Sequence, residues 1–85
     1  MVHKYRKMPI VEAIQYLREE NISEIQSFIK DGSLQFSPKD NEYILRTVDG
    51  DYVLKYGYYI VKDVDGQYYL HSPDVFSRMY TIYSD

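Results

Sequence analysis

The chain has 85 residues, no cysteine and a formal net charge of −3. This length predicts a single domain, residues 1–85, with a thin core. The lack of cysteine excludes disulfides and thiol chemistry, and the acidic balance argues against general nucleic-acid binding. No apolar run approaches the roughly 18 residues that a membrane helix needs, and no apolar run follows the basic start as in a secretory signal. We therefore expect a cytoplasmic protein.

Two extended segments are expected at the start of the chain, residues 4–8 and residues 10–17, separated by Pro9. In the second segment apolar side chains fall on both faces of a strand, whereas Val11, Ile14 and Leu17 also fit a helical stripe. We favour the strand.

The pattern predicts an amphipathic helix over residues 22–30, with an apolar stripe of Ile22, Ile25, Phe28 and Ile29. Asn21 is expected to cap its first turn, with Glu24 in the capping-box position. Gly32 follows where a left-handed helix end favours a residue without a Cβ.

The rest of the chain is typical of β-structure. A short strand over residues 33–36 ends at a turn over residues 37–40. Two hairpins are then expected around two-residue turns, Asp49-Gly50 and Asp65-Gly66. Their strands cover residues 43–48, 51–55, 58–64 and 67–71. In this register Thr47 opposes Tyr52, Leu45 opposes Leu54, Lys62 opposes Tyr69 and Val61 opposes Leu70.

Ser72, Pro73 and Asp74 are typical of a helix start, and they predict a short helix over residues 73–79. Val75, Phe76 and Met79 are expected to face the core, and residues 81–83 to add a last strand. The expected fold class is α+β: a small antiparallel β-meander, forming a curled sheet or a partly open barrel.

Residues 4–16 read K-Y-R-K-M-P-I-V-E-A-I-Q-Y, residues 55–62 read K-Y-G-Y-Y-I-V-K and residues 72–76 read S-P-D-V-F. These segments resemble K-Y-R-K-K-P-V-V-x-E-A-I-Q-F, K-P-G-D-Y-I-I-K and K-P-D-I-F in a family of small phage and prophage proteins of Gram-positive bacteria. The likeness covers most of the chain and is weakest over residues 18–42. The family's Pro-Gly-Asp is Tyr56-Gly57-Tyr58 here. The resemblance implies a phage accessory protein in the host cell cytoplasm, and it implies no particular reaction.

The sequence contains no catalytic motif, neither a phosphate-binding glycine loop nor a nucleophile elbow nor a His-Glu-x-x-His helix. Its two histidines, His3 and His71, do not have metal-ligand spacing. We therefore expect no enzyme activity, no metal and no cofactor.

Tyrosine carries the main functional signal, because the chain has eleven tyrosines and no tryptophan. Strand alternation predicts that about half of them fill the core. Exposed rings can stack on a base or anchor a protein interface, and neighbouring cations can hold a phosphate. The candidate ligand-binding residues are Tyr5, Arg6, Lys7, Arg46, Lys55, Tyr56, Tyr58, Tyr68 and His71. The basic residues at the start of the chain have a second interpretation, as an edge strand whose charge prevents pairing with another sheet. His71 also has a second interpretation, as a half-exposed residue that bonds to a nearby backbone group.

The first functional hypothesis is a phage counter-defence protein that sequesters a nucleotide-like immune signal. The thin core favours a homo-oligomer. The alternatives are an inhibitor that binds a host defence effector or nuclease, and a minor structural or assembly protein of the phage.

Overall fold

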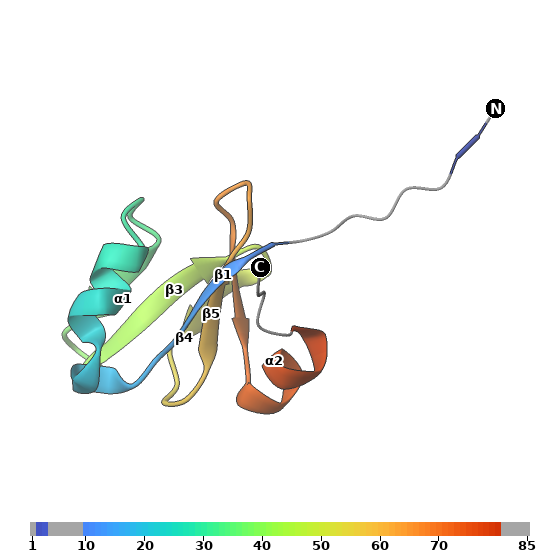
Figure 1. Cartoon of the computed structure of the whole chain (residues 1–85). Helices are drawn as coiled ribbons and strands as arrows, with labels where there is room; N and C mark the ends of the chain where they lie inside the picture. The colour runs from blue at the N-terminus through green and yellow to red at the C-terminus, as the bar shows by residue number, and fades with distance from the viewer. Residues whose placement is uncertain (1, 4–9, 81–85) are drawn as a thin grey trace.

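The computed structural model describes residues 2–3 and 10–80 (Figure 1). Within these residues the elements are β1 (Glu12–Gln15), the 3-10 turn η1 (Arg18–Glu20), α1 (Ile22–Phe28), β2 (Leu34–Ser37), β3 (Glu42–Thr47), β4 (Gly50–Val53), β5 (Tyr59–Lys62), β6 (Tyr68–His71) and α2 (Pro73–Met79). The expected α+β class is confirmed, as are the strand within residues 10–17 and both helices. The predicted strands over residues 4–8 and 81–83 lie outside the described residues.

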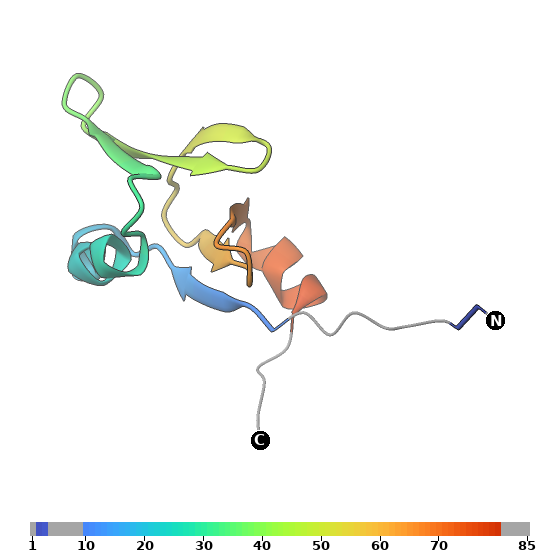
Figure 2. The same ribbon diagram turned by 90° about the horizontal axis from the view of Figure 1, so that it is seen from above.

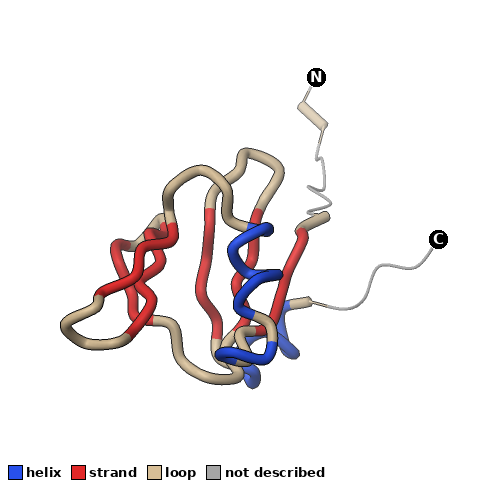
Figure 3. The backbone as a smooth tube through the Cα atoms, turned by 90° about the vertical axis from the view of Figure 1, so that its left-hand side faces the viewer, coloured by secondary structure: helices blue, strands red, loops and turns tan. Residues whose placement is uncertain are grey.

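The strands form two antiparallel three-stranded sheets, the first ordered β1-β5-β6 and the second β2-β3-β4. Figures 2 and 3 show them as two separate groups of strands. The two predicted hairpins both form, but each belongs to a different sheet, joined by the connection over residues 54–58. One backbone hydrogen bond, from Val48 N to Tyr68 O (3.1 Å), links the sheets, so the fold is a partly open arrangement rather than a closed barrel.

The register of the β3–β4 hairpin differs from the prediction by two residues. Leu45 opposes Tyr52 and Thr47 opposes Gly50, so the turn residues are Val48 and Asp49. The Thr47 hydroxyl donates to Gly50 O (2.7 Å) and accepts from Asp49 N (3.1 Å), while Gly50 takes a φ of +122°. A shift of two keeps every side chain on its face, and it places Tyr52 opposite the buried Leu45.

The β5–β6 register differs by one residue, because the loop has three residues instead of two. Gly66 adopts a φ of +79° and its N–H bonds to Asp63 O (3.0 Å), which resembles a type I turn followed by a glycine bulge. A one-residue shift exchanges faces. Leu70 therefore opposes Ile60 on the core side, and Tyr69 opposes Val61 on the other side.

The first turn of α1 is not capped by Asn21, contrary to the prediction. The nearly buried amide instead bonds to the preceding segment: Asn21 Oδ1 accepts from Leu17 N (2.9 Å) and Nδ2 donates to Gln15 O (2.6 Å). Asn21 thus fixes the path from β1 into the helix. Gly32 has the expected positive φ (+88°), but the helix already ends at Phe28.

The main core lies between the two sheets and α1. Its buried residues are Tyr16, Ile25, Ile29, Leu45, Leu54, Ile60 and Tyr68. Burial of these apolar side chains is the main driving force for folding, and one core thereby holds all three layers together.

The short helix α2 covers the opposite face of the first sheet. Phe76 stacks on Tyr59 with ring centroids 4.0 Å apart and planes 2° apart, and Val61, on the same face as Tyr59, is fully buried. Ser72 Oγ caps the helix by accepting from Val75 N (3.4 Å). Met79 was expected to face the core, but it is 55% exposed; Tyr80 instead packs against Phe76.

Candidate functional site

Two of the predicted ligand-binding residues, Lys55 and Tyr58, meet in a hollow between the two sheets, here named the inter-sheet cleft. It measures about 330 Å³ and is lined by Thr47, Asp49, Tyr52, Val53, Lys55, Tyr58 and Leu70. This volume lies at the small end of the range typical of ligand sites. The cleft combines two tyrosine side chains with one cation, one carboxylate and the hydroxyl of Thr47.

The connection over residues 54–58 positions the cation of the cleft. It turns through a hydrogen bond from Tyr58 N to Lys55 O (3.0 Å), and Gly57 N bonds to Tyr16 O (2.7 Å). Gly57 has a φ of +87°, which favours glycine. As a result Lys55 Nζ lies 5.7 Å from the centroid of the Tyr58 ring, within the range of a cation–π interaction.

The β3–β4 hairpin supplies the other wall of the cleft. The observed register places Tyr52 on the same face as Leu45, and the Tyr52 side chain is 46% exposed. The turn that Thr47 stabilises carries Asp49 at the rim. An aromatic face, a carboxylate and an ammonium group are therefore arranged around one small volume.

Arg46 and Tyr68 do not line the inter-sheet cleft. They border a neighbouring hollow of about 220 Å³ that shares Thr47 with it. Arg46 Nε lies 4.0 Å from Asp51 Oδ1 across the strand pair, an exposed contact that contributes little stability. Tyr68 is only 3% exposed, so its ring fills the core, and burial raises the pKa of its hydroxyl above the ordinary value.

The remaining predicted residues are dispersed. Tyr56 is 54% exposed and lies beneath the guanidinium of Arg18, 5.7 Å from its ring centroid. His71 lies on the α2 side of the first sheet, between the rings of Tyr69 and Tyr80. Its Nε2 is buried without a hydrogen-bond partner among the described residues. Tyr5, Arg6 and Lys7 lie outside the described residues.

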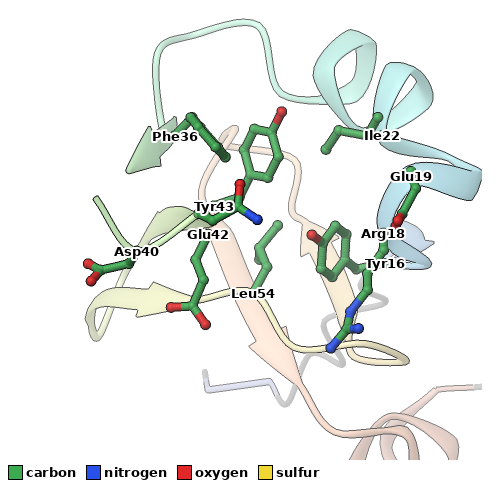
Figure 4. A pocket seen from close by; sticks show the side chains of 10 residues that line it. Tyr16, Arg18, Glu19, Ile22, Phe36, Asp40, Glu42, Tyr43 and Leu54 are labelled. Carbon is green, nitrogen blue, oxygen red and sulfur yellow. The ribbon is translucent and has the colours of Figure 1, made fainter. Parts of the chain in front are cut away.

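A second and larger hollow, here named the acidic groove, separates η1 and α1 from the second sheet (Figure 4). It measures about 510 Å³ and is lined by Tyr16, Arg18, Glu19, Ile22, Phe36, Asp40, Asn41, Glu42, Tyr43 and Leu54. Its lining thus includes three carboxylates and one guanidinium. Arg18 and Asn41 have φ values of +56° and +54°, a conformation uncommon for residues with a Cβ.

Comparison with family models, curated proteins and solved structures finds no match to this chain. The resemblance to phage proteins therefore stays a prediction. No helix in the described part of the chain is long and apolar enough to cross a membrane. The described residues also contain no group of three or more His, Asp or Glu side chains placed to hold a metal ion.

Sequence reasoning missed the acidic groove. Its lining comes from four separate stretches, residues 16–22, residue 36, residues 40–43 and residue 54, so no local motif marks it. The one local signal was the Ser37-Pro38-Lys39-Asp40 turn, which places Asp40 and Asn41 at the end of the second sheet.

Proposed function

We propose that this domain is a non-catalytic binding module whose inter-sheet cleft takes a small nucleotide-like ligand. The observation that carries the proposal is the convergence of Tyr52, Tyr58 and Lys55 on one concave site. Each supplies an interaction that a nucleotide needs, and they come from segments that only the folded chain brings together.

The ligand's base suits the aromatic walls of the cleft. Stacking of a base on an aromatic side chain contributes about 1–3 kcal/mol and tolerates any base. Tyr52 is half-exposed on the edge strand β4, and Tyr58 is partly buried. Leu70 and Val53 add apolar surface to the lining of the cleft.

The polar groups of the cleft suit the rest of a nucleotide. The Lys55 ammonium group lies over Tyr58, where it can pair with a phosphate next to a stacked base. Asp49 at the rim provides a carboxylate that can accept hydrogen bonds from ribose hydroxyls. The resemblance to phage proteins supports sequestration of a host immune signal as the biological role of such binding.

Calorimetric titration tests this proposal, with cyclic AMP, cyclic di-AMP and ADP-ribose as probes. We expect saturable heat with at least one of them and a rise in the thermal unfolding midpoint. Lys55→Gln should weaken that binding about tenfold, because a charge-assisted hydrogen bond to phosphate is lost. Lys30→Gln, which changes an exposed lysine beyond the end of α1, is the matched control and should leave the affinity unchanged. Absence of heat and of thermal stabilisation with all three probes would contradict the proposal.

A further inference from the structure

The edge strand β4 is the only strand in the described part of the chain whose residues are all exposed. Two of them, Tyr52 and Val53, are large apolar residues. Natural edge strands are commonly protected from pairing by lysine, proline or a bulge. β4 carries neither lysine nor proline, and its register with β3 is continuous. In Figure 2 it forms the rim of the second sheet that lies away from the first sheet, so a further strand can reach it.

The hydrogen bonds to β3 decide which backbone groups of β4 are free to pair. Leu54 N donates to Tyr43 O (2.9 Å), so the backbone groups of residue 54 point towards β3. Because these groups alternate in direction along a strand, those of Tyr52 also point towards β3. The N–H and C=O groups of Asp51 and Val53 therefore point away from β3, along the free edge.

One antiparallel register lets two copies of β4 pair all of these free groups with each other. It places Asp51 opposite Val53 of the second copy, with Tyr52 on the two-fold axis. A register centred on Asp51 would oppose two carboxylates, which is unfavourable. A register centred on Val53 would require Lys55 opposite Asp51, but the carbonyl of Lys55 already accepts from Tyr58 N (3.0 Å).

The charges at the two ends of β4 suit the same register. Asp49 precedes the strand, Lys55 follows it, and both line the inter-sheet cleft. Neither side chain forms an ion pair with a described residue. A two-fold axis through Tyr52 brings the start of one strand next to the end of the other, so each Lys55 ammonium group approaches the Asp49 carboxylate of the second copy. Opposite charges across a strand pair stabilise it.

We propose that two copies of this chain pair through β4 to form a symmetric dimer, in which the two β2-β3-β4 sheets become one continuous sheet. The backbone groups of Asp51 and Val53 supply the hydrogen bonds, and the two Tyr52 side chains meet across the axis on the face that carries Leu45. Tyr52 also lines the inter-sheet cleft, so the dimer places the two clefts next to each other. The pairing needs no ligand, and the proposal does not depend on nucleotide binding.

Sedimentation equilibrium of the full chain without nucleotide tests the dimer, and paired substitutions test its register. We expect a reversible monomer–dimer equilibrium. Val53→Glu places a carboxylate opposite Asp51 of the second copy, whereas Val53→Lys removes the same apolar side chain and places an ammonium group there. Each dimer contains two such pairs, so Val53→Lys should dimerise about tenfold more tightly than Val53→Glu.

The matched controls are Val64→Glu and Val64→Lys, which make the same changes in net charge at an exposed position between β5 and β6. These two variants should dimerise equally tightly. A chain that stays monomeric at all concentrations would overturn the proposal, as would equal dimerisation of the two Val53 variants. A difference between the two Val64 variants as large as that at Val53 would show an effect of net charge alone and would overturn it too.

Cross-linking tests the position of the axis, and it decides the question if a Val53 variant fails to fold. The chain has no cysteine, so one introduced thiol reports on itself. Directly opposed residues that exchange no hydrogen bonds have Cα atoms about 4.5 Å apart, within the range of a disulfide. Tyr52→Cys should therefore form a covalent dimer under mild oxidation. Val53→Cys should not, because its two copies lie two positions out of register; the opposite pattern, or no cross-linking of Tyr52→Cys, would contradict the proposed pairing.

Discussion

Burial raises the pKa of the Tyr16 hydroxyl above its ordinary value of 10.0. The pKa of Tyr69 is raised chiefly by the hydrogen bond that its hydroxyl donates to Asp63 Oδ2 (2.8 Å). In both cases the folded chain favours the protonated phenol. At the residue scale, these tyrosines therefore link the folded state to pH.

The direction of this link follows from the bound protons. Between the unfolded and folded pKa values the folded chain holds more protons than the unfolded chain, so its stability falls as pH rises. We predict that these two tyrosines leave the free energy of unfolding unchanged below about pH 9 and lower it above about pH 10, where unfolded tyrosine ionises. Tyr16→Phe should lose less stability over this range. Urea unfolding of both proteins measures this difference, and equal losses would show that Tyr16 does not titrate differently on folding.

Residue type alone predicted only part of the environment of each tyrosine. Alternation correctly implied that some tyrosines fill the core, as Tyr16 and Tyr68 do. It could not distinguish Tyr68 from Tyr69, because their faces depend on the loop between β5 and β6. The two neighbours consequently differ in environment, Tyr68 packing near Phe28 (6.4 Å between ring centroids) and Tyr69 bonding to Asp63.

At the scale of elements, the β5–β6 loop decides which side chains enter the core. Gly66 has open space where a Cβ would lie and a φ of +79°, so a substitution there acts through backbone strain alone. We predict that Gly66→Ala lowers the free energy of unfolding by about 1 kcal/mol, and that Gly66→Asn costs less because asparagine tolerates this conformation better. Chemical denaturation measures both. A Gly66→Ala protein as stable as the parent would contradict the observed loop geometry.

The same loop shows where prediction from sequence succeeds and fails. Apolar periodicity and turn residues located the strands of both hairpins and both helices to within a few residues. The strand register was not predicted correctly, because Asp65-Gly66 permits a two-residue turn as readily as a three-residue loop. In the structure Asp63 Oδ1 stabilises the three-residue loop by accepting hydrogen bonds from Asp65 N and Gln67 N. Asn21 was assigned as a cap from local sequence, yet its amide serves the β1 connection.

On the scale of the whole molecule, the two hollows arise because the sheets are linked but not continuous. The inter-sheet cleft lies beside the 54–58 connection, and the acidic groove lies between η1 and the second sheet. Side chains that only the folded chain brings together leave no local signal in the sequence. Lys55 and Tyr58 were predicted as ligand residues, but for this reason their neighbours in the cleft were not. The expected homo-oligomer stays a prediction.

Amide chemical-shift mapping of the labelled chain during titration with cyclic AMP, cyclic di-AMP and ADP-ribose tests the central claim most directly. Binding in the inter-sheet cleft predicts that the largest shifts cluster at Thr47, Tyr52, Lys55 and Tyr58, with small changes at Glu19 and Glu42 in the acidic groove. Saturable shifts confined to other faces of the described structure, or no shifts with any of the three nucleotides, would contradict it.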